Sequence, residues 1–274
     1  MLSLCPLWQF EFMTLHTKTS GSGPDLVLIH GWGLHSGIWN GLMPLLEPQL
    51  RVTRVDLPGH GRSAWGGETS LDAMVDAVSA VAPAGAAWLG WSLGGLLAMY
   101  ATARQTADIR ALVTVASSPC FGRKRDWHSA MLPQLLDTFA TELEQDYLRT
   151  LDRFLALQVR GSEQARSVLK TLQAAMQQYE APRPEALQAG LHILAGADLR
   201  DDLASIHCPV LLVAGERDTL VPAGAMSALQ GYLPGAELEI MAGAGHAPFI
   251  ADPVLFAKTV TAFVLVSQVV LAFA

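Results

Sequence analysis

This 274-residue chain has few charged residues, because only 16% of its residues are Asp, Glu, Lys or Arg. A typical soluble domain is about 25% charged. Apolar residues make up 51%. Disordered chains are rich in charge and poor in apolar residues, so this composition excludes a disordered protein. The length allows one large core, either as a single domain with an insertion or as two domains.

Basic residues and cysteines are also few. There are 18 Lys and Arg against 25 Asp and Glu, a net charge of -7, which argues against a nucleic-acid-binding protein. The three cysteines, Cys5, Cys120 and Cys208, lie far apart in the sequence. Neither a disulfide framework nor a zinc-binding spacing is present, so we expect a reducing compartment and a cytoplasmic protein.

Long hydrophobic runs are missing as well, since no stretch reaches the roughly 18 residues that a membrane-spanning helix needs. Residues 1–13 lack a basic start and contain Glu11, which argues against a secretory signal. Residues 260–274 carry no charge. We expect them to form a last helix packed on the core, with a membrane or partner contact as the alternative.

Metal-binding and nucleotide-binding motifs are absent too. The chain has no H-E-x-x-H, no paired cysteines, no G-x-G-x-x-G after the first expected strand and no Walker loop. We therefore expect a reaction that needs neither a metal nor a cofactor.

Six short apolar runs predict buried strands, at residues 25–29, 51–55, 86–89, 111–115, 209–214 and 237–241. Most are continuous rather than alternating, which is typical of parallel strands covered on both faces. Helices are expected between them: one over 71–82 capped by Ser70, one from Leu93 and one after Pro253. This alternation predicts an α/β fold with a mostly parallel sheet and helices on both faces.

The alternation stops between residues 120 and 206, where helices are expected at about 127–141, 143–159, 162–178 and 185–194. We interpret this region as a helical cap inserted into the core. The predicted domains are residues 13–119 and 207–274 for the core and 120–206 for the cap. Residues 120–200 hold ten basic and ten acidic residues, so the negative charge belongs to the core.

The strongest local motif is Gly90-Trp91-Ser92-Leu93-Gly94, between an expected strand and an expected helix. That context is the one a G-x-S-x-G nucleophile elbow requires, with small residues where the turn is sharp. It exposes the Ser92 hydroxyl at the end of the sheet. It also places the Leu93 N–H at a helix N-terminus, where it can stabilise a developing oxyanion.

A serine nucleophile needs a base, and the base needs an orienting acid. The chain order Ser, acid, His selects Asp218 after the run 209–214, with Glu216 and Asp198 as weaker alternatives. His246 follows the run 237–241 in a glycine-rich loop. His60 lies upstream of Ser92, so chain order argues against it as the base.

The second oxyanion donor is expected from His30-Gly31-Trp32-Gly33, which follows the first strand run. The Trp32 N–H would supply it. Trp32 and Trp91 are also candidates to wall an acyl pocket, with simple core packing as the alternative for both.

Together these motifs resemble the α/β-hydrolase superfamily across nearly the whole chain. The strings Ser117-Ser118-Pro119-Cys120 and Phe154-Leu155-Ala156-Leu157-Gln158 resemble, within it, the carboxylesterases of the biotin pathway. The resemblance implies hydrolysis of the methyl ester of a pimeloyl group carried on acyl-carrier protein. It maps the catalytic triad onto Ser92, Asp218 and His246, and it implies that Trp32, Phe154 and Gln158 contact the acyl chain.

An acidic carrier protein with a phosphopantetheine phosphate would give the basic residues of the cap a role. Arg149 and Arg153 are four residues apart, as are Arg166 and Lys170, so each pair shares a helix face. These four form the expected docking surface; a solvated face with local ion pairs is the alternative. Two features depart from the family pattern: about 12 residues before Met13 and the uncharged C-terminal stretch.

Two other functions remain open at this point. One is a broad-specificity carboxylesterase for short-chain esters. The other is a non-catalytic ligand receptor on a hydrolase fold, which the intact Ser, Asp and His order disfavours.

Overall fold

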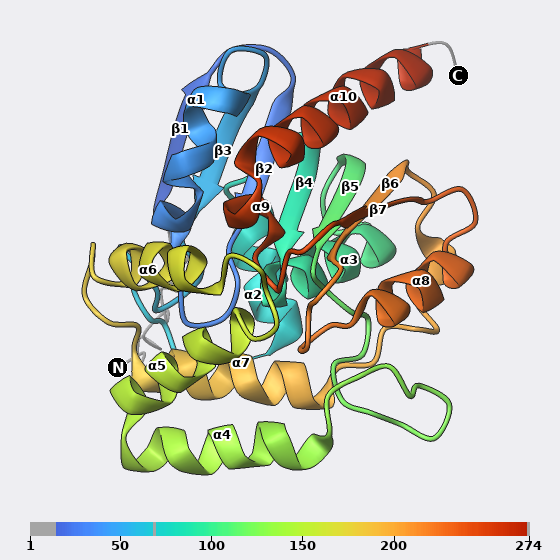
Figure 1. Ribbon diagram of the computed structural model, residues 1–274. Coiled ribbons are helices and arrows are strands. Elements are labelled where there is room, and N and C mark those ends of the chain that lie inside the picture. The colour runs from blue at the N-terminus through green and yellow to red at the C-terminus, as the bar shows by residue number, and fades with distance from the viewer. Residues whose placement is uncertain (1–14, 68–69, 273–274) are drawn as a thin grey trace, which may run out of the picture.

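The computed structural model describes residues 15–67 and 70–272, and its centre is a seven-stranded sheet in the order β1-β3-β2-β4-β5-β6-β7 (Figure 1). Only β1 is antiparallel to its neighbour, β3; all other pairs are parallel. The strands are β1 Thr17–Gly21, β2 Asp25–Ile29, β3 Arg51–Val55, β4 Ala86–Trp91, β5 Ile109–Val115, β6 Val210–Gly215 and β7 Glu237–Met241.

All six apolar runs that predicted strands are strands of this sheet. Every residue of β4 and β6 is buried, as expected for central parallel strands. β1 was not predicted, because its sequence Thr-Lys-Thr-Ser-Gly has no apolar run. Among the strands that the structure describes, β1 pairs with β3 alone, at the edge of the sheet, where a polar strand can stay partly exposed.

Two helical layers cover the sheet, as the sequence predicted (Figure 1). One layer holds the 3-10 helix η1 and the helices α1, α9 and α10; the other holds α2, α3 and α8. Alternate strand residues point into two separate cores: Trp88 lies in the α3 core, and Ala87 and Leu89 lie in the α10 core. The bounds are η1 Ser36–Leu42, α1 Met43–Leu46, α2 Leu71–Ser79, α3 Leu93–Arg104, α8 Ala223–Tyr232, α9 Pro248–Ala251 and α10 Pro253–Ala272.

The uncharged C-terminal stretch belongs to α10. Val260 and Val264 are fully buried, and Phe263 is 7% exposed, all in the core on that face of the sheet. This confirms the expected packing of a last helix on the core, although Val266 on its outer side is 61% exposed. The residues before and including Met13, and residues 273–274, lie outside the described part of the chain.

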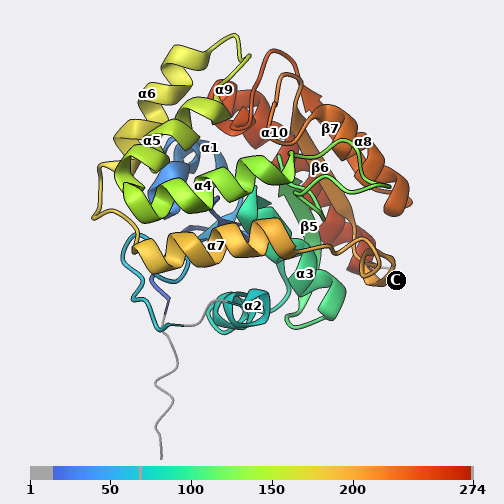
Figure 2. The ribbon, with the colours of Figure 1, turned by 90° about the horizontal axis from the view of Figure 1, so that it is seen from below.

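Four helices between β5 and β6 lie across the carboxyl ends of the parallel strands (Figure 2). We call this segment the cap. Its helices are α4 Pro133–Gln145, α5 Tyr147–Gln158, α6 Ala165–Met176 and α7 Pro184–Gly196. The expectation of a helix from residue 127 is wrong, because Lys124 and Trp127 exchange both backbone hydrogen bonds in a tight loop and α4 starts with Pro133 in its first turn.

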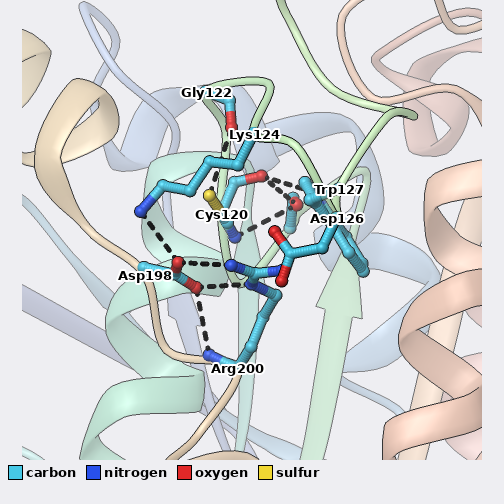
Figure 3. Close-up of polar contacts among 8 residues, drawn as sticks. Cys120, Gly122, Lys124, Asp126, Trp127, Asp198 and Arg200 are labelled. Carbon is cyan, nitrogen blue, oxygen red and sulfur yellow. Dashed lines mark hydrogen bonds and ion pairs between the residues drawn. The ribbon is translucent and has the colours of Figure 1, made fainter.

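The two chain segments that join the cap to the core meet each other (Figure 3). The Asp198 carboxylate accepts hydrogen bonds from Lys124 Nζ at 2.8 Å and from Arg200 Nε and Nη2, each at 2.8 Å. Arg200 also pairs with Asp126 at 2.9 Å. A short 3-10 helix, η2 Leu203–Ser205, then leads back to the core. We call Lys124, Asp126, Asp198 and Arg200 the hinge cluster. Hydrogen bonds from Arg200 outweigh burial and hold the pKa of Asp198 well below its usual range.

Within the ranges that the structure describes, no helix is both long enough and apolar enough to cross a membrane.

The hinge cluster makes a stability prediction. Asp198→Ala leaves the Arg200 guanidinium, whose side chain is 11% exposed, without its two-pronged partner, and we expect the free energy of unfolding to fall by about 1–3 kcal/mol. Urea denaturation measures this. The control is Asp126→Ala, which removes a carboxylate that is 72% exposed and should change stability much less. An equal fall in the free energy of unfolding for the two variants would contradict the role of Asp198 as the main partner of Arg200.

Candidate active site

Ser92 is the residue between β4 and α3, and its backbone has φ +54° and ψ -116°, outside the ordinary regions for a residue with a side chain. Hydrogen bonds of its backbone hold it there. Its N–H donates to Val115 O at 2.9 Å, and its carbonyl accepts from Ser117 Oγ at 2.7 Å, from Gly95 N at 3.0 Å and from Leu96 N at 3.1 Å. The turn is therefore strained and held by its surroundings, as a nucleophile elbow requires.

The glycines of the motif are needed for space. A Cβ at Gly90 would lie 2.1 Å from Gly94 O, and a Cβ at Gly94 would lie 2.4 Å from Ile29 O. Both distances are far below a van der Waals contact with backbone atoms. The sharp turn predicted from the sequence is thus the observed one, and no larger residue fits at either position.

Asp218 and His246 meet at the same edge of the sheet. His246 Nδ1 and Asp218 Oδ2 are 2.7 Å apart, and both side chains are at most 1% exposed. Asp218 Oδ1 accepts from the N–H groups of Leu220 at 2.8 Å and Val221 at 3.0 Å. The carboxylate therefore has partners on both oxygens, and it leaves Nε2 as the imidazole nitrogen for proton transfer.

The two weaker candidates for the acid lie elsewhere. Asp198 belongs to the hinge cluster, bonded to Lys124 and Arg200. Glu216 Oε2 accepts a hydrogen bond from Gly243 N at 2.8 Å, so the Glu216 side chain holds the backbone of the loop that carries His246. Among the described residues, His246 Nε2 has no hydrogen-bond partner, which leaves it available to a substrate or to the serine.

The predicted oxyanion donors flank Ser92. Leu93 is the first residue of α3, so its N–H has no acceptor within the helix and lies at the positive end of the helix dipole. The loop 30–33 follows β2 on the neighbouring strand, and a Cβ on Gly31 would lie 3.4 Å from Ser92 Cβ. Trp32 therefore follows a residue whose backbone lies beside Ser92, and its N–H is the candidate for the second oxyanion donor.

Trp32 also meets the cap. Its Nε1 donates to Leu187 O in α7 at 2.8 Å, and its ring packs edge-on against Phe154 of α5, with centroids 4.8 Å apart. A Cβ on Gly190 would lie only 2.6 Å from the Trp32 ring, so α7 approaches closely because this residue is glycine. Phe139 of α4 packs on Phe154 at 5.6 Å. The structure thus brings Trp32 and Phe154 together as one aromatic wall.

Trp91 and Gln158 lie beside the histidine loop rather than in this wall. The Trp91 ring is fully buried against Phe249, and its Nε1 donates to His246 O at 2.7 Å. Gln158 O accepts from His246 N at 3.0 Å, and Gln158 is 2% exposed. Both residues therefore hold the main chain of His246.

The four basic residues expected to form the docking surface are all exposed, and they lie in two places. Arg149 and Arg153 on α5 line an open cavity of about 390 Å³ between α4 and α5, together with Glu142 and Asp146. Arg153 pairs with Glu142 and lies over the Phe139 ring. Arg166 and Lys170 lie on α6, outside this cavity.

A buried group of histidines beside the oxyanion loop was missed by sequence reasoning. His30 Nδ1–H donates to Gly31 O at 2.8 Å, and its Nε2 accepts from Leu57 N at 2.9 Å. Asp56, which follows β3, accepts from Ser36 N at 2.7 Å and Arg62 N at 3.1 Å. The available signal was that His30 and Asp56 directly follow neighbouring parallel strands. This network fixes the loop that carries Trp32.

Burial sets the protonation of this group. It lowers the pKa of His30 to about 3 and that of His60 to about 4, and it also lowers the pKa of His35. For Asp56 burial alone would raise the pKa, but hydrogen bonds from Ser36 and from the Arg62 N–H leave the pKa below its usual value. The histidines are therefore neutral at pH 7 beside an ionised carboxylate.

No cluster of three or more potential metal ligands from His, Cys, Asp and Glu occurs among residues 15–67 and 70–272.

Comparisons with known proteins place this geometry in context. The model of the alpha/beta hydrolase family matches residues 26–259. The chain is 43% identical over 243 residues to a pimeloyl-[acyl-carrier protein] methyl ester esterase of Nitrosomonas europaea, covering 89% of this chain and 96% of that one. It is 44% identical over 250 residues to the protein of that name from Yersinia pseudotuberculosis, covering 91% and 96%. An esterase structure from Exiguobacterium antarcticum has a TM-score of 0.81 at 19% identity, covering 91% and 95%, and shows the shared fold.

The buried histidines predict how stability depends on pH. Since the folded pKa values of His30 and His60 lie below the value of 6.5 for an exposed histidine, the unfolded chain binds protons that the folded chain does not. The free energy of unfolding should therefore fall as pH drops from 6.5 toward 4. Between pH 7 and pH 5 each histidine should contribute up to about 2 kcal/mol, measured by urea denaturation at both values.

The matched variants are His60→Asn and His128→Asn. The first keeps a donor for Pro58 O but removes a buried titrating group, so the difference between pH 7 and pH 5 should shrink. The second alters an exposed histidine and should leave the difference as in the wild type. A wild-type difference in His60→Asn would contradict this account.

Proposed function

The chain belongs to the α/β hydrolase family, and from this premise we propose that it is a serine carboxylesterase that hydrolyses the methyl ester of pimeloyl-acyl-carrier protein in biotin synthesis. The observation that carries the reaction type is the buried 2.7 Å contact of His246 with Asp218, at the sheet edge where Ser92 sits in a strained elbow. Supporting the substrate are the 43–44% identity to relatives named for it and the strings in residues 117–120 and 154–158.

The mechanism follows from the roles of these groups. His246 Nε2 takes the proton of Ser92 Oγ as the oxygen attacks the ester carbonyl. The tetrahedral intermediate collapses to an acyl-enzyme, and His246 returns the proton to the leaving methoxide, which departs as methanol. His246 then activates a water that releases the free carboxylate and regenerates Ser92. Asp218 holds the imidazole in the required tautomer and stabilises its cation.

Two backbone N–H groups, of Trp32 and Leu93, stabilise the oxyanion in this proposal. Each such donor is worth about 2.7–4 kcal/mol of transition-state stabilisation. In this proposal Trp32, Phe154, Trp91 and Gln158 line the acyl site. Trp91 and Gln158 also hold the main chain of His246. The chemistry uses protein groups and water alone, with no metal or cofactor.

The carrier protein docks on the cap in this proposal. Arg149 and Arg153 on α5 and Arg166 and Lys170 on α6 present exposed positive charge that suits an acidic carrier and its phosphate. Residues 120–206 act as the cap domain, between core domains at 13–119 and 207–274. A cytoplasmic location is part of the same proposal, supported by the scattered cysteines and the free Cys120 and Cys208.

The first test removes the nucleophile. Ser92→Ala should lower kcat for a p-nitrophenyl ester by about a thousandfold or more, because no other group can form the acyl-enzyme. A fluorophosphonate probe should label the wild type and not the variant. Ser227→Ala, on the outside of α8, is the control and should behave as the wild type. A folded Ser92→Ala that keeps more than a few per cent of activity would refute the triad, and an unlabelled wild type would favour a non-catalytic receptor.

The second test separates a carrier-specific enzyme from a broad carboxylesterase. Reversing two charges in Arg149→Glu/Arg153→Glu should lower kcat/KM for pimeloyl-acyl-carrier protein methyl ester at least about tenfold, because charge complementarity guides docking. Hydrolysis of p-nitrophenyl acetate should stay within about twofold, since no docking is needed. Arg123→Glu/Arg125→Glu makes the same charge change on an exposed cap loop and is the control. Equal rates for all three proteins on the carrier substrate would support the broad carboxylesterase.

A further inference from the structure

Residues 158–163 begin at the last residue of α5 and lead toward α6, and we call them the α5–α6 turn (Figure 1). This turn lies against both loops that carry the acid and the base. Two backbone hydrogen bonds join it to the histidine loop. Gln158 O accepts from His246 N at 3.0 Å, and Glu163 N donates to Gly243 O at 3.0 Å. The turn is thus hydrogen-bonded to this loop at two positions, Gly243 and His246, which are three residues apart.

The backbone of His246 forms one hydrogen bond with the cap and one with the core. Its N–H is bonded by the cap, through Gln158 O, and its carbonyl accepts from Trp91 Nε1 of β4 at 2.7 Å. His246 is 1% exposed, so water cannot replace either bond without a change in structure. The orientation of the imidazole toward Asp218 and Ser92 consequently depends on both partners.

The turn also reaches the loop that carries Asp218. Arg217 Nη2 pairs with Glu163 Oε1 at 2.7 Å, and Arg217 N donates to Ala244 O at 2.8 Å. A single residue next to the acid therefore contacts the cap with its side chain and the histidine loop with its backbone. The two catalytic loops and the turn form one hydrogen-bonded unit.

Glycine permits this close approach. A Cβ on Gly245 would lie 2.9 Å from Gln158 O and 3.3 Å from Ser162 Cβ. Gly243 has φ +67°, and a Cβ there would lie 2.7 Å from Glu163 Oε2. Any larger residue at Gly245 would separate the turn from the loop that it holds.

We infer that the α5–α6 turn is a positioning element for His246, which is aligned for catalysis only while the cap is seated on the two catalytic loops. This inference rests on the proposed function, because it assigns His246 as the base. It also links the expected docking surface to the chemistry. The turn connects α5, which carries Arg149 and Arg153, to α6, which carries Arg166 and Lys170, so a partner bound across both helices acts on the element that holds His246.

The ion pair gives the first experiment, with p-nitrophenyl acetate as a substrate that needs no carrier. Glu163→Gln and Arg217→Gln should each lower kcat about two- to fivefold, with KM within twofold, because the pair is partly exposed. The swapped variant Glu163→Arg/Arg217→Glu should recover most of the loss. Asp152→Asn and Arg104→Gln, exposed sites on α5 and α3, are the charge controls and should match the wild type.

Gly245→Ala is the stronger perturbation and should lower kcat at least about tenfold. Gly231→Ala, whose Cβ would meet none of the described residues within 4 Å, should leave kcat unchanged. Amide hydrogen exchange supplies a local readout, because a general loss of stability would speed exchange throughout the protein, including a peptide from α2. Exchange of a peptide spanning 242–248 should become faster in Glu163→Gln and in Gly245→Ala, while a peptide spanning 71–79 keeps its wild-type rate. The swapped variant should restore the rate that Glu163→Gln changes.

The outcomes separate this inference from the proposed function. Wild-type kcat and wild-type exchange in all of these variants would overturn the inference while leaving the esterase intact. A wild-type chain without esterase activity would overturn the proposed function. The exchange experiment then decides by itself whether the turn holds the histidine loop.

Discussion

The turn at Ser92 is the constraint on which the rest of the site depends. A residue with a side chain is held at φ +54°, and this conformation persists because its N–H and carbonyl are bonded to β5 and to the loop that follows it. The turn can be this sharp only because Gly90 and Gly94 have no side chains. Its result is a hydroxyl at the end of a central strand and a free N–H at the start of α3, beside each other at one edge of the sheet.

The parallel sheet explains why the other groups come to the same place. The strands β2 to β7 are parallel, so their carboxyl ends lie on the same side of the sheet. The residues just after those ends therefore become neighbours although they lie far apart in the chain. Trp32 follows β2, Asp56 follows β3, Asp218 follows β6 and His246 follows β7. The buried histidines, neutral at pH 7, and the ionised Asp56 form a second layer behind the oxyanion loop, and the hydrogen bonds of His30 and Asp56 hold this loop in place.

The cap contacts the loops that carry Trp32 and His246 directly. It supplies Phe154 to the aromatic wall, accepts the Trp32 indole on Leu187 O, and bonds the backbone of His246 through Gln158. At its other end the hinge cluster ties its two connecting segments together (Figure 3). These contacts explain the composition of the chain: apolar and small residues fill the interfaces of sheet, helices and cap, and few positions remain for charge.

Much of this arrangement was predictable from local patterns. Six apolar runs predicted six strands, and the Gly-x-Ser-x-Gly motif, with an acid and a histidine in the right order, pointed to Ser92, Asp218 and His246. The edge strand β1 and the start of α4 were not predictable, because a polar strand carries no apolar signal and Trp127 is drawn into a loop by contacts with Lys124 and Cys120. Contacts between segments that are distant in the sequence could not be predicted either, among them those of His30 with Leu57 and of Asp198 with Lys124.

The sequence by itself therefore determined the class of fold, the sharp turn at Ser92 and the order of the groups proposed for catalysis, because these depend on local periodicity, on glycine and on chain order. Only the tertiary structure decided which of Asp218, Glu216 and Asp198 is the partner of His246, because all three lie near a strand or helix end downstream of Ser92. Of these three carboxylates, that of Asp218 is the one bonded to the imidazole. It also decided that Trp91 and Gln158 hold the main chain of His246, because those bonds join segments that become neighbours only when the sheet and the cap are packed together.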